Sequence, residues 1–97
     1  MGWRKYLEQM LADADPRSYT FDQAATVLHQ LGFVMAKPSG GSHRRFRLQI
    51  VDQGPPITKR TVIIGLVDSG KGALKPVYIK EMVRELRENH LLPDGVE

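Results

Sequence analysis

Hydrophobic residues recur along this chain with two different spacings, which separate helical from extended segments. Near the start, Trp3, Leu7 and Met10 lie three or four residues apart with polar residues between them. This spacing is typical of an amphipathic helix, because residues three and four apart share one helix face. The pattern predicts a helix over residues 2–13 that ends before Pro16, since the residue before a proline is pushed out of the helical conformation.

A second amphipathic pattern begins at Thr20 and ends at Gly32. Thr20 is a good N-cap, and Gln23 stands where the side chain of a capping box reaches back to the N-cap backbone. Gly32 is a favourable residue at a helix C-terminus. A helix is therefore predicted between them, followed by a short apolar strand over Phe33–Ala36 and a loop of turn-forming residues over 37–41.

After this loop the spacing changes to two, which is typical of a strand with one buried and one solvated face. Phe46, Leu48 and Ile50 are expected to face the core. The residues that alternate with them are expected to face solvent: His43, Arg45, Arg47 and Gln49. A turn over Asp52–Pro56 and a β-branched strand over Thr61–Leu66 would complete a hairpin.

The last third of the chain predicts one more helix. Pro76 suits its first position, and Ile79, Met82 and Leu86 form an apolar stripe along it. The element order is therefore α-α-β-β-β-α. The predicted fold class is α+β, with a three-stranded antiparallel sheet packed on helices.

Length and composition limit the possible classes of protein. At 97 residues, 41% hydrophobic and 26% charged, the chain is expected to form a single folded domain over residues 1–97. It has no cysteine, which excludes disulfide scaffolds, thiol nucleophiles and cysteine-ligated metal sites. The apolar run over Val62–Val67 is far shorter than the ~20 residues that a membrane span needs. With no secretory signal pattern at the start, a cytoplasmic protein is expected.

The net charge of +3 comes from one part of the chain. Residues 37–60 contain six basic residues and one acidic residue, whereas the segments on either side each carry a net charge of −1. The six basic residues are Lys37, Arg44, Arg45, Arg47, Lys59 and Arg60. We expect them to form a compact patch on one sheet face and its rim, as in proteins that contact phosphates. The alternative is a solvated hairpin without a ligand.

His43 is the candidate reactive residue. It follows two glycines and a serine and opens the polar face of the basic strand. Histidine is the side chain that most readily gives and takes protons near neutral pH. The alternative is a surface histidine without a catalytic role, which is the interpretation for His29 and His90 on their helical patterns. No His, Asp and Glu cluster has metal-ligand spacing, so no metal is expected.

Three stretches occur in a characteristic order: Leu31–Phe33 (LGF), Gly41–Phe46 (GSHRRF) and Lys71–Pro76 (KGALKP), the last leading into an apolar helix. In this order, and in a basic chain of this length, they resemble the HicA-type toxins of bacterial toxin–antitoxin pairs. The resemblance covers roughly residues 20–90, and the GSHxxF signature is its most specific part. The helix over residues 2–13 precedes it, and either packs on its own domain or contacts a partner.

The resemblance implies a double-stranded-RNA-binding-like fold and a metal-independent endoribonuclease that cleaves mRNA and arrests growth. By position, His43 would be its catalytic residue. The residues expected to bind RNA are Lys37, Gly41, Ser42, Arg44, Arg45, Arg47, Lys59, Arg60 and Lys71. No cofactor is implied. The implied partners are the mRNA substrate and a HicB-type antitoxin that covers the active site, with DNA contacted only indirectly through the antitoxin complex.

The expected reaction is attack of a ribose 2′-OH on the adjacent phosphate, with His43 as general base or acid. Arg45 and Arg47 would hold the phosphate and offset the charge on its oxygens. Gly41 and Ser42 would let RNA approach closely. Strict pleating turns Arg44 to the other face, but near the start of the strand it could still reach the RNA backbone. Dependence on the 2′-OH predicts RNA rather than DNA as substrate, and phosphate contacts predict little sequence preference.

Two other functions are compatible with the same residues. One is a non-catalytic RNA-binding module of the same fold. The other is an interaction protein whose basic patch binds only an acidic protein.

Overall fold

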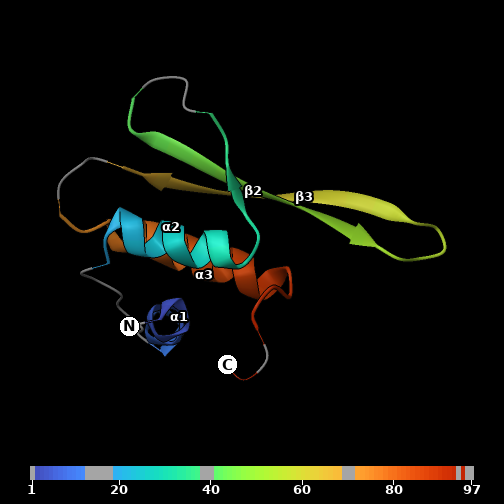
Figure 1. The fold of residues 1–97 in the computed structure, drawn as a ribbon, viewed down its shortest axis with the longest axis horizontal. Helices are drawn as coiled ribbons and strands as arrows, with labels where there is room; N and C mark the ends of the chain where they lie inside the picture. Colours follow the sequence, from blue (N-terminus) through green and yellow to red (C-terminus); the bar gives the residue numbers. More distant parts are fainter. Residues whose placement is uncertain (1, 13–18, 38–40, 69–71, 94, 96–97) are drawn as a thin grey trace.

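The structure, a computed structural model, describes residues 2–12, 19–37, 41–68, 72–93 and 95. Its fold class is α+β, and its elements follow the predicted order α-α-β-β-β-α (Figure 1). The elements are α1 (Trp3–Ala12), α2 (Phe21–Gln30), β1 (Val34–Met35), β2 (His43–Asp52), β3 (Thr58–Val67) and α3 (Pro76–Glu88). The helix break predicted at Pro16 and the predicted RNA-binding residue Lys71 lie outside the described residues.

The three strands form an antiparallel sheet with β2 in the centre. β2 and β3 pair over ten residues each, from His43 opposite Val67 to Asp52 opposite Thr58. The hairpin is longer than the hydrophobic pattern predicted, because pairing continues through polar residues near the turn that show no apolar alternation. Its distal end extends well beyond the helices (Figure 1).

β1 is shorter than predicted. Of the expected strand over Phe33–Ala36, only Val34 and Met35 pair with β2, opposite Arg47 and Phe46. β1 therefore covers only a small part of one edge of β2.

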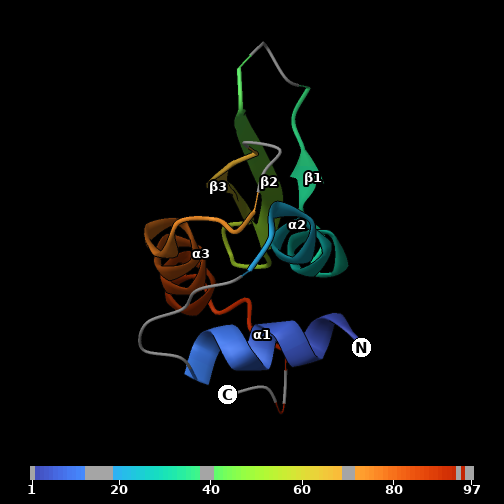
Figure 2. The same ribbon diagram turned by 90° about the vertical axis from the view of Figure 1, so that its left-hand side faces the viewer.

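The helices lie on one side of the sheet, in two layers. Figure 2 shows α2 and α3 against the sheet and α1 on the far side of these two helices. The hairpin residues that face α2 and α3 are buried, and they include Phe46, Ile64 and Leu66. α1 contributes the fully buried Leu7 and Met10 and so packs on its own domain. No helix among the described residues is long and apolar enough to cross a membrane.

The ends of α2 confirm the predicted capping pattern. The Thr20 hydroxyl oxygen accepts a hydrogen bond from the Gln23 backbone N–H at 3.1 Å, and the Gln23 side-chain oxygen accepts one from the Thr20 N–H at 2.9 Å. After the helix, Gly32 has a φ of +102°, a conformation that glycine adopts without a steric penalty. The sequence therefore fixes both ends of this helix locally.

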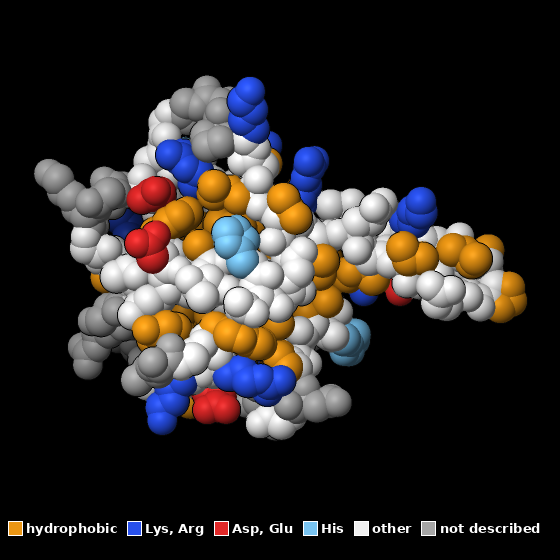
Figure 3. Space-filling view, viewed as in Figure 1, with side chains coloured by type: hydrophobic (Ala, Val, Ile, Leu, Met, Phe, Trp, Pro, Cys, Tyr) orange, Lys and Arg blue, Asp and Glu red, His pale blue; other side chains and the backbone are white. Residues whose placement is uncertain are grey.

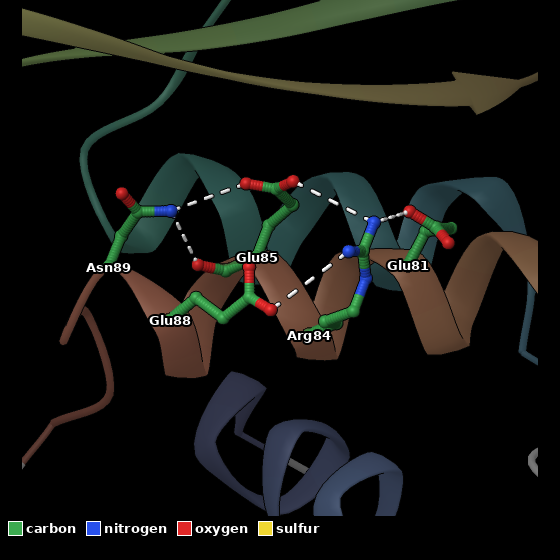
Figure 4. Close-up of polar contacts among 5 residues, drawn as sticks. All are labelled: Glu81, Arg84, Glu85, Glu88 and Asn89. Carbon is green, nitrogen blue, oxygen red and sulfur yellow. Dashed lines mark hydrogen bonds and ion pairs between the residues drawn. The ribbon is translucent and has the colours of Figure 1, made fainter.

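α3 carries a charge cluster of one arginine and three glutamates. Arg84 donates a hydrogen bond to Glu81 and lies 3.9 Å from both Glu85 and Glu88 (Figure 4). The hydrogen bond and charge of Glu81, then the charge of Glu88, raise the pKa of Arg84 above its ordinary value. The single arginine offsets only part of the charge of the three glutamates, and this partly exposed cluster keeps a net negative charge.

Candidate functional site

β2 presents its polar residues on the sheet face that faces away from the helices. Along its first half the side chains alternate, so that Phe46 is fully buried while His43, Arg45 and Arg47 are exposed. This confirms the predicted face of each residue. None of the described helices covers this outer face of the sheet (Figure 2).

The cross-strand neighbours of the two arginines differ in kind. Arg47 lies between Val34 on β1 and Ile63 on β3, whose side chains are 63% and 55% exposed. Arg45 lies opposite Gly65, and a Cβ added at Gly65 would meet nothing within 4 Å. The surface beside Arg45 is therefore open, whereas Arg47 is flanked by aliphatic side chains.

The chain just before β2 is held by short polar contacts. The Arg44 guanidinium donates hydrogen bonds to the carbonyl oxygens of Gly41 and His43, at 2.9 and 3.1 Å. The Asp68 N–H donates to the Ser42 carbonyl at 2.6 Å, which continues the β2–β3 pairing by one step. Arg44 therefore supports the backbone that carries His43. Both of these bonds come from one guanidinium nitrogen, and the expected contact of Arg44 with RNA stays a prediction.

Lys37 lies at the same end of the sheet as His43. The N–H of the preceding Ala36 donates to the Arg45 carbonyl at 2.8 Å, and Lys37 itself is exposed. Lys and Arg side chains gather along this upper part of the molecule, over the connection between β1 and β2 and the start of β2 (Figure 3). The exposed Arg45 and Arg47 form, with His43, what we call the outer basic face, and the exposed Lys37 lies at the same end of the sheet.

Lys59 and Arg60 do not join this group, so the prediction of one compact patch is wrong for them. Lys59 lies opposite Val51, eight residues along β2 from His43, or about 26 Å at 3.3 Å per residue. Arg60 lies on the inner side of the sheet, opposite Ile50. The cause is the register of the hairpin, which places the two ends of the basic segment far apart.

A pocket of about 320 Å³ opens at the end of the sheet where β2 begins. Its walls come from the start of α2, the end of β3 and the start of α3, together with the residues just before it. The lining residues are Thr20, Phe21, Asp22, Val67, Asp68, Gly72, Ala73, Leu74, Lys75 and Tyr78. Val67 is also the cross-strand partner of His43, so the pocket adjoins the candidate reactive residue.

The pocket was not predicted from the sequence, although part of its basis was visible there. Thr20 and Pro76 mark the starts of two helices, and the antiparallel hairpin returns the chain to the same end of the sheet. The contacts that close this end are long-range: Thr20 bridges to Ala73, and the Leu74 N–H donates to the Tyr19 carbonyl at 2.7 Å. No local pattern indicates such pairings.

These features define a small α+β domain with one uncovered, histidine- and arginine-bearing sheet face beside a pocket. In the described parts of the chain, no three His, Asp or Glu side chains are grouped so that they could hold a metal ion. Searches against protein-family models, curated proteins and solved structures found no match to the chain. The functional inference therefore depends on the residues of the site and on the resemblance of their motif.

Proposed function

We propose that this protein is a metal-independent endoribonuclease that cleaves mRNA, acting as the toxin of a HicA-type toxin–antitoxin pair. The observation that supports the proposal best is the placement of His43, Arg45 and Arg47 at alternate positions on one uncovered sheet face. A proton-transfer group and two cations on a single strand can all contact one segment of RNA backbone. The GSHRRF motif that carries the resemblance supplies these residues.

The chemistry requires the groups of this face together with solvent water. His43 takes the proton from a ribose 2′-OH as its oxygen attacks the adjacent phosphorus, and the bond from phosphorus to the 5′-oxygen breaks. The 5′-oxygen then takes up a proton from water, which leaves a 2′,3′-cyclic phosphate and a 5′-hydroxyl. Arg45 offsets the charge that builds on the phosphate oxygens, because a guanidinium forms charge-assisted hydrogen bonds to phosphate.

A neutralising antitoxin would cover the outer basic face. The exposed aliphatic side chains of Val34 and Ile63 on either side of Arg47 give this face apolar area as well as charge. Such a combination suits a protein partner with an acidic rim and apolar centre, because complementary charge steers association and apolar contact supplies affinity. The same partner would block RNA from His43.

Incubation of the purified protein with single-stranded RNA in EDTA tests the proposal. His43→Asn is expected to lower the cleavage rate by about 10²–10⁴-fold, the usual contribution of a general acid or base. His90→Asn is the matched control, since His90 follows α3 with a φ of 55°, a conformation that asparagine tolerates. Products with 2′,3′-cyclic phosphate ends would support the reaction.

Unchanged cleavage in His43→Asn would contradict the role of His43. RNA binding without any cleavage by the unmodified protein would instead favour the non-catalytic RNA-binding module. Expression in a bacterial host gives a second measure, since growth arrest that disappears in His43→Asn is expected only of a toxin.

A further inference from the structure

The pocket beside His43 has walls of three chemical kinds. Phe21 and Tyr78 bring aromatic rings to it, and both are half-buried. Asp22 and Asp68 bring carboxylates, and Lys75 brings an ammonium group. Figure 3 shows acidic side chains flanking hydrophobic ones at the left of the view, near the start of α2.

This composition differs from that of a phosphate site. An ionised carboxylate only accepts hydrogen bonds and repels phosphate, so that two of them disfavour an anion. The aromatic rings offer flat apolar surfaces, and Phe21 is held in place by its contact with Phe46, with ring centroids 6.0 Å apart. Proteins that recognise single-stranded RNA stack its bases on aromatic rings and read the base edges with hydrogen bonds.

We propose that this pocket binds a guanine base of the RNA, with the Asp22 carboxylate accepting hydrogen bonds from its Watson–Crick edge. A guanine offers two adjacent donors on that edge, N1–H and the N2 amino group, beside the acceptor O6. A carboxylate with two oxygens matches two adjacent donors, and Lys75 supplies a donor for O6. Adenine, cytosine and uracil each lack the pair of adjacent donors.

Asp22 is assigned as the acceptor because of its place in the fold. It stands in the first turn of α2, directly after Phe21, and is exposed. These two consecutive residues therefore line the same pocket. Asp68 lies on another wall, where its backbone is hydrogen-bonded to Ser42.

This inference rests on the proposed function for its RNA substrate and extends it with a base preference. The pocket and the outer basic face share the His43–Val67 pair, whose Cα atoms lie about 5 Å apart in antiparallel pairing. The base would enter on the helix side of this pair, and the RNA backbone would pass the end of the sheet to bring a neighbouring phosphate to His43 on the outer face. Cleavage is then expected next to guanosine, whereas phosphate contacts alone would give little sequence preference.

Equilibrium binding of 5′-GMP, 5′-IMP and 5′-AMP to the full-length chain tests the pocket apart from catalysis. IMP lacks only the N2 amino group of GMP, so it keeps one of the two donors. GMP is expected to bind about tenfold or more tightly than IMP, the usual effect of one hydrogen bond to a charged group. Asp22→Asn should abolish this preference, while Asp68→Asn and the remote Glu8→Gln on α1 should keep it. Thermal unfolding of each variant checks that the fold is intact.

Equal binding of GMP and IMP would overturn the inference, and loss of the preference in Asp68→Asn alone would overturn the assignment to Asp22. Cleavage of an RNA in which one guanosine is replaced by inosine gives the second readout, with a slower cut expected at that position. A GMP preference without cleavage of any RNA would contradict the proposed function and leave the pocket assignment standing. Cleavage without any base preference would contradict the pocket assignment and leave the proposed function standing.

Discussion

Arg60 on β3 donates a hydrogen bond to the side-chain oxygen of Asn89, the C-cap residue of α3. The same guanidinium lies 3.4 Å from the Asp52 carboxylate on β2. Asn89 is in turn part-buried and donates to the Glu85 carbonyl at 2.8 Å (Figure 4). Arg60 therefore connects the extended half of the hairpin to the end of α3, at the point where the hairpin leaves the helical layer.

Arg60→Gln is expected to destabilise the fold, because it removes these connections. A loss of about 1 kcal/mol in the free energy of unfolding is expected, since Arg60 is partly exposed and each contact is screened by solvent. Lys59→Gln, at the adjacent position on the opposite sheet face, is expected to change it by less than about 0.5 kcal/mol. Urea denaturation measures the free energy of unfolding of both variants. An equal change in the two variants would contradict the role of Arg60.

The salt dependence of RNA binding distinguishes the outer basic face from the rest of the basic segment. Arg45→Gln together with Arg47→Gln is expected to lower the slope of log affinity against log salt by about 1.4, which is 0.7 for each lost phosphate contact. Lys59→Gln together with Arg60→Gln removes the same charge and is expected to change the slope much less. Binding to single-stranded RNA at several salt concentrations provides the measurement. Similar slope changes in the two double variants would show that RNA follows the whole hairpin.

Local patterns were sufficient for the element order and for the face of each β2 residue. The alternation around Phe46 set which side chains are buried, and the Thr20 capping box and Gly32 set the ends of α2. These features are encoded by neighbouring residues, so the sequence alone reveals them.

The shape of the site depends on long-range pairing that no local pattern encodes. The register of the hairpin places Lys59 far from His43 and turns Arg60 toward α3. The contacts of Thr20 with Ala73 and of Tyr19 with Leu74 then form the pocket. A count of charges along the sequence thus found the segment that carries the basic face but overestimated how many of its residues belong to it.

The role of α1 can be tested through its buried stripe. Leu7 is fully buried, and Leu7→Ala is expected to lower the free energy of unfolding by about 2–5 kcal/mol, the usual cost of a core cavity. The exposed neighbour Glu8→Ala is expected to change it by less than about 0.5 kcal/mol. Denaturant unfolding followed by Trp3 fluorescence measures both variants. Near-native stability of Leu7→Ala would show that α1 contributes little to the core.

Two glycines of the hairpin are expected to respond in opposite ways to alanine. Gly54 has a φ of +29°, and a Cβ there would lie 1.8 Å from the Pro56 carbonyl oxygen, so Gly54→Ala must shift the backbone of the turn. A loss of more than about 1 kcal/mol is expected. A Cβ at Gly65 meets nothing within 4 Å, so Gly65→Ala is expected to be neutral or stabilising by about 0.4–1 kcal/mol. The midpoint temperature of thermal unfolding is therefore expected to fall in Gly54→Ala and to stay the same or rise in Gly65→Ala.

Gly65 also provides a test of where the RNA phosphate lies. Its lack of a side chain leaves the surface beside Arg45 open, so a phosphate can approach the guanidinium from that side. Gly65→Val would fill this space while suiting a strand, and is expected to lower RNA cleavage by about tenfold without loss of stability. Thr61→Val, four residues earlier on the same strand face and opposite Gln49, is the matched control and should cleave normally. Normal cleavage by Gly65→Val would place the phosphate elsewhere on the outer basic face, because a branched side chain beside Arg45 cannot leave a close phosphate contact unchanged.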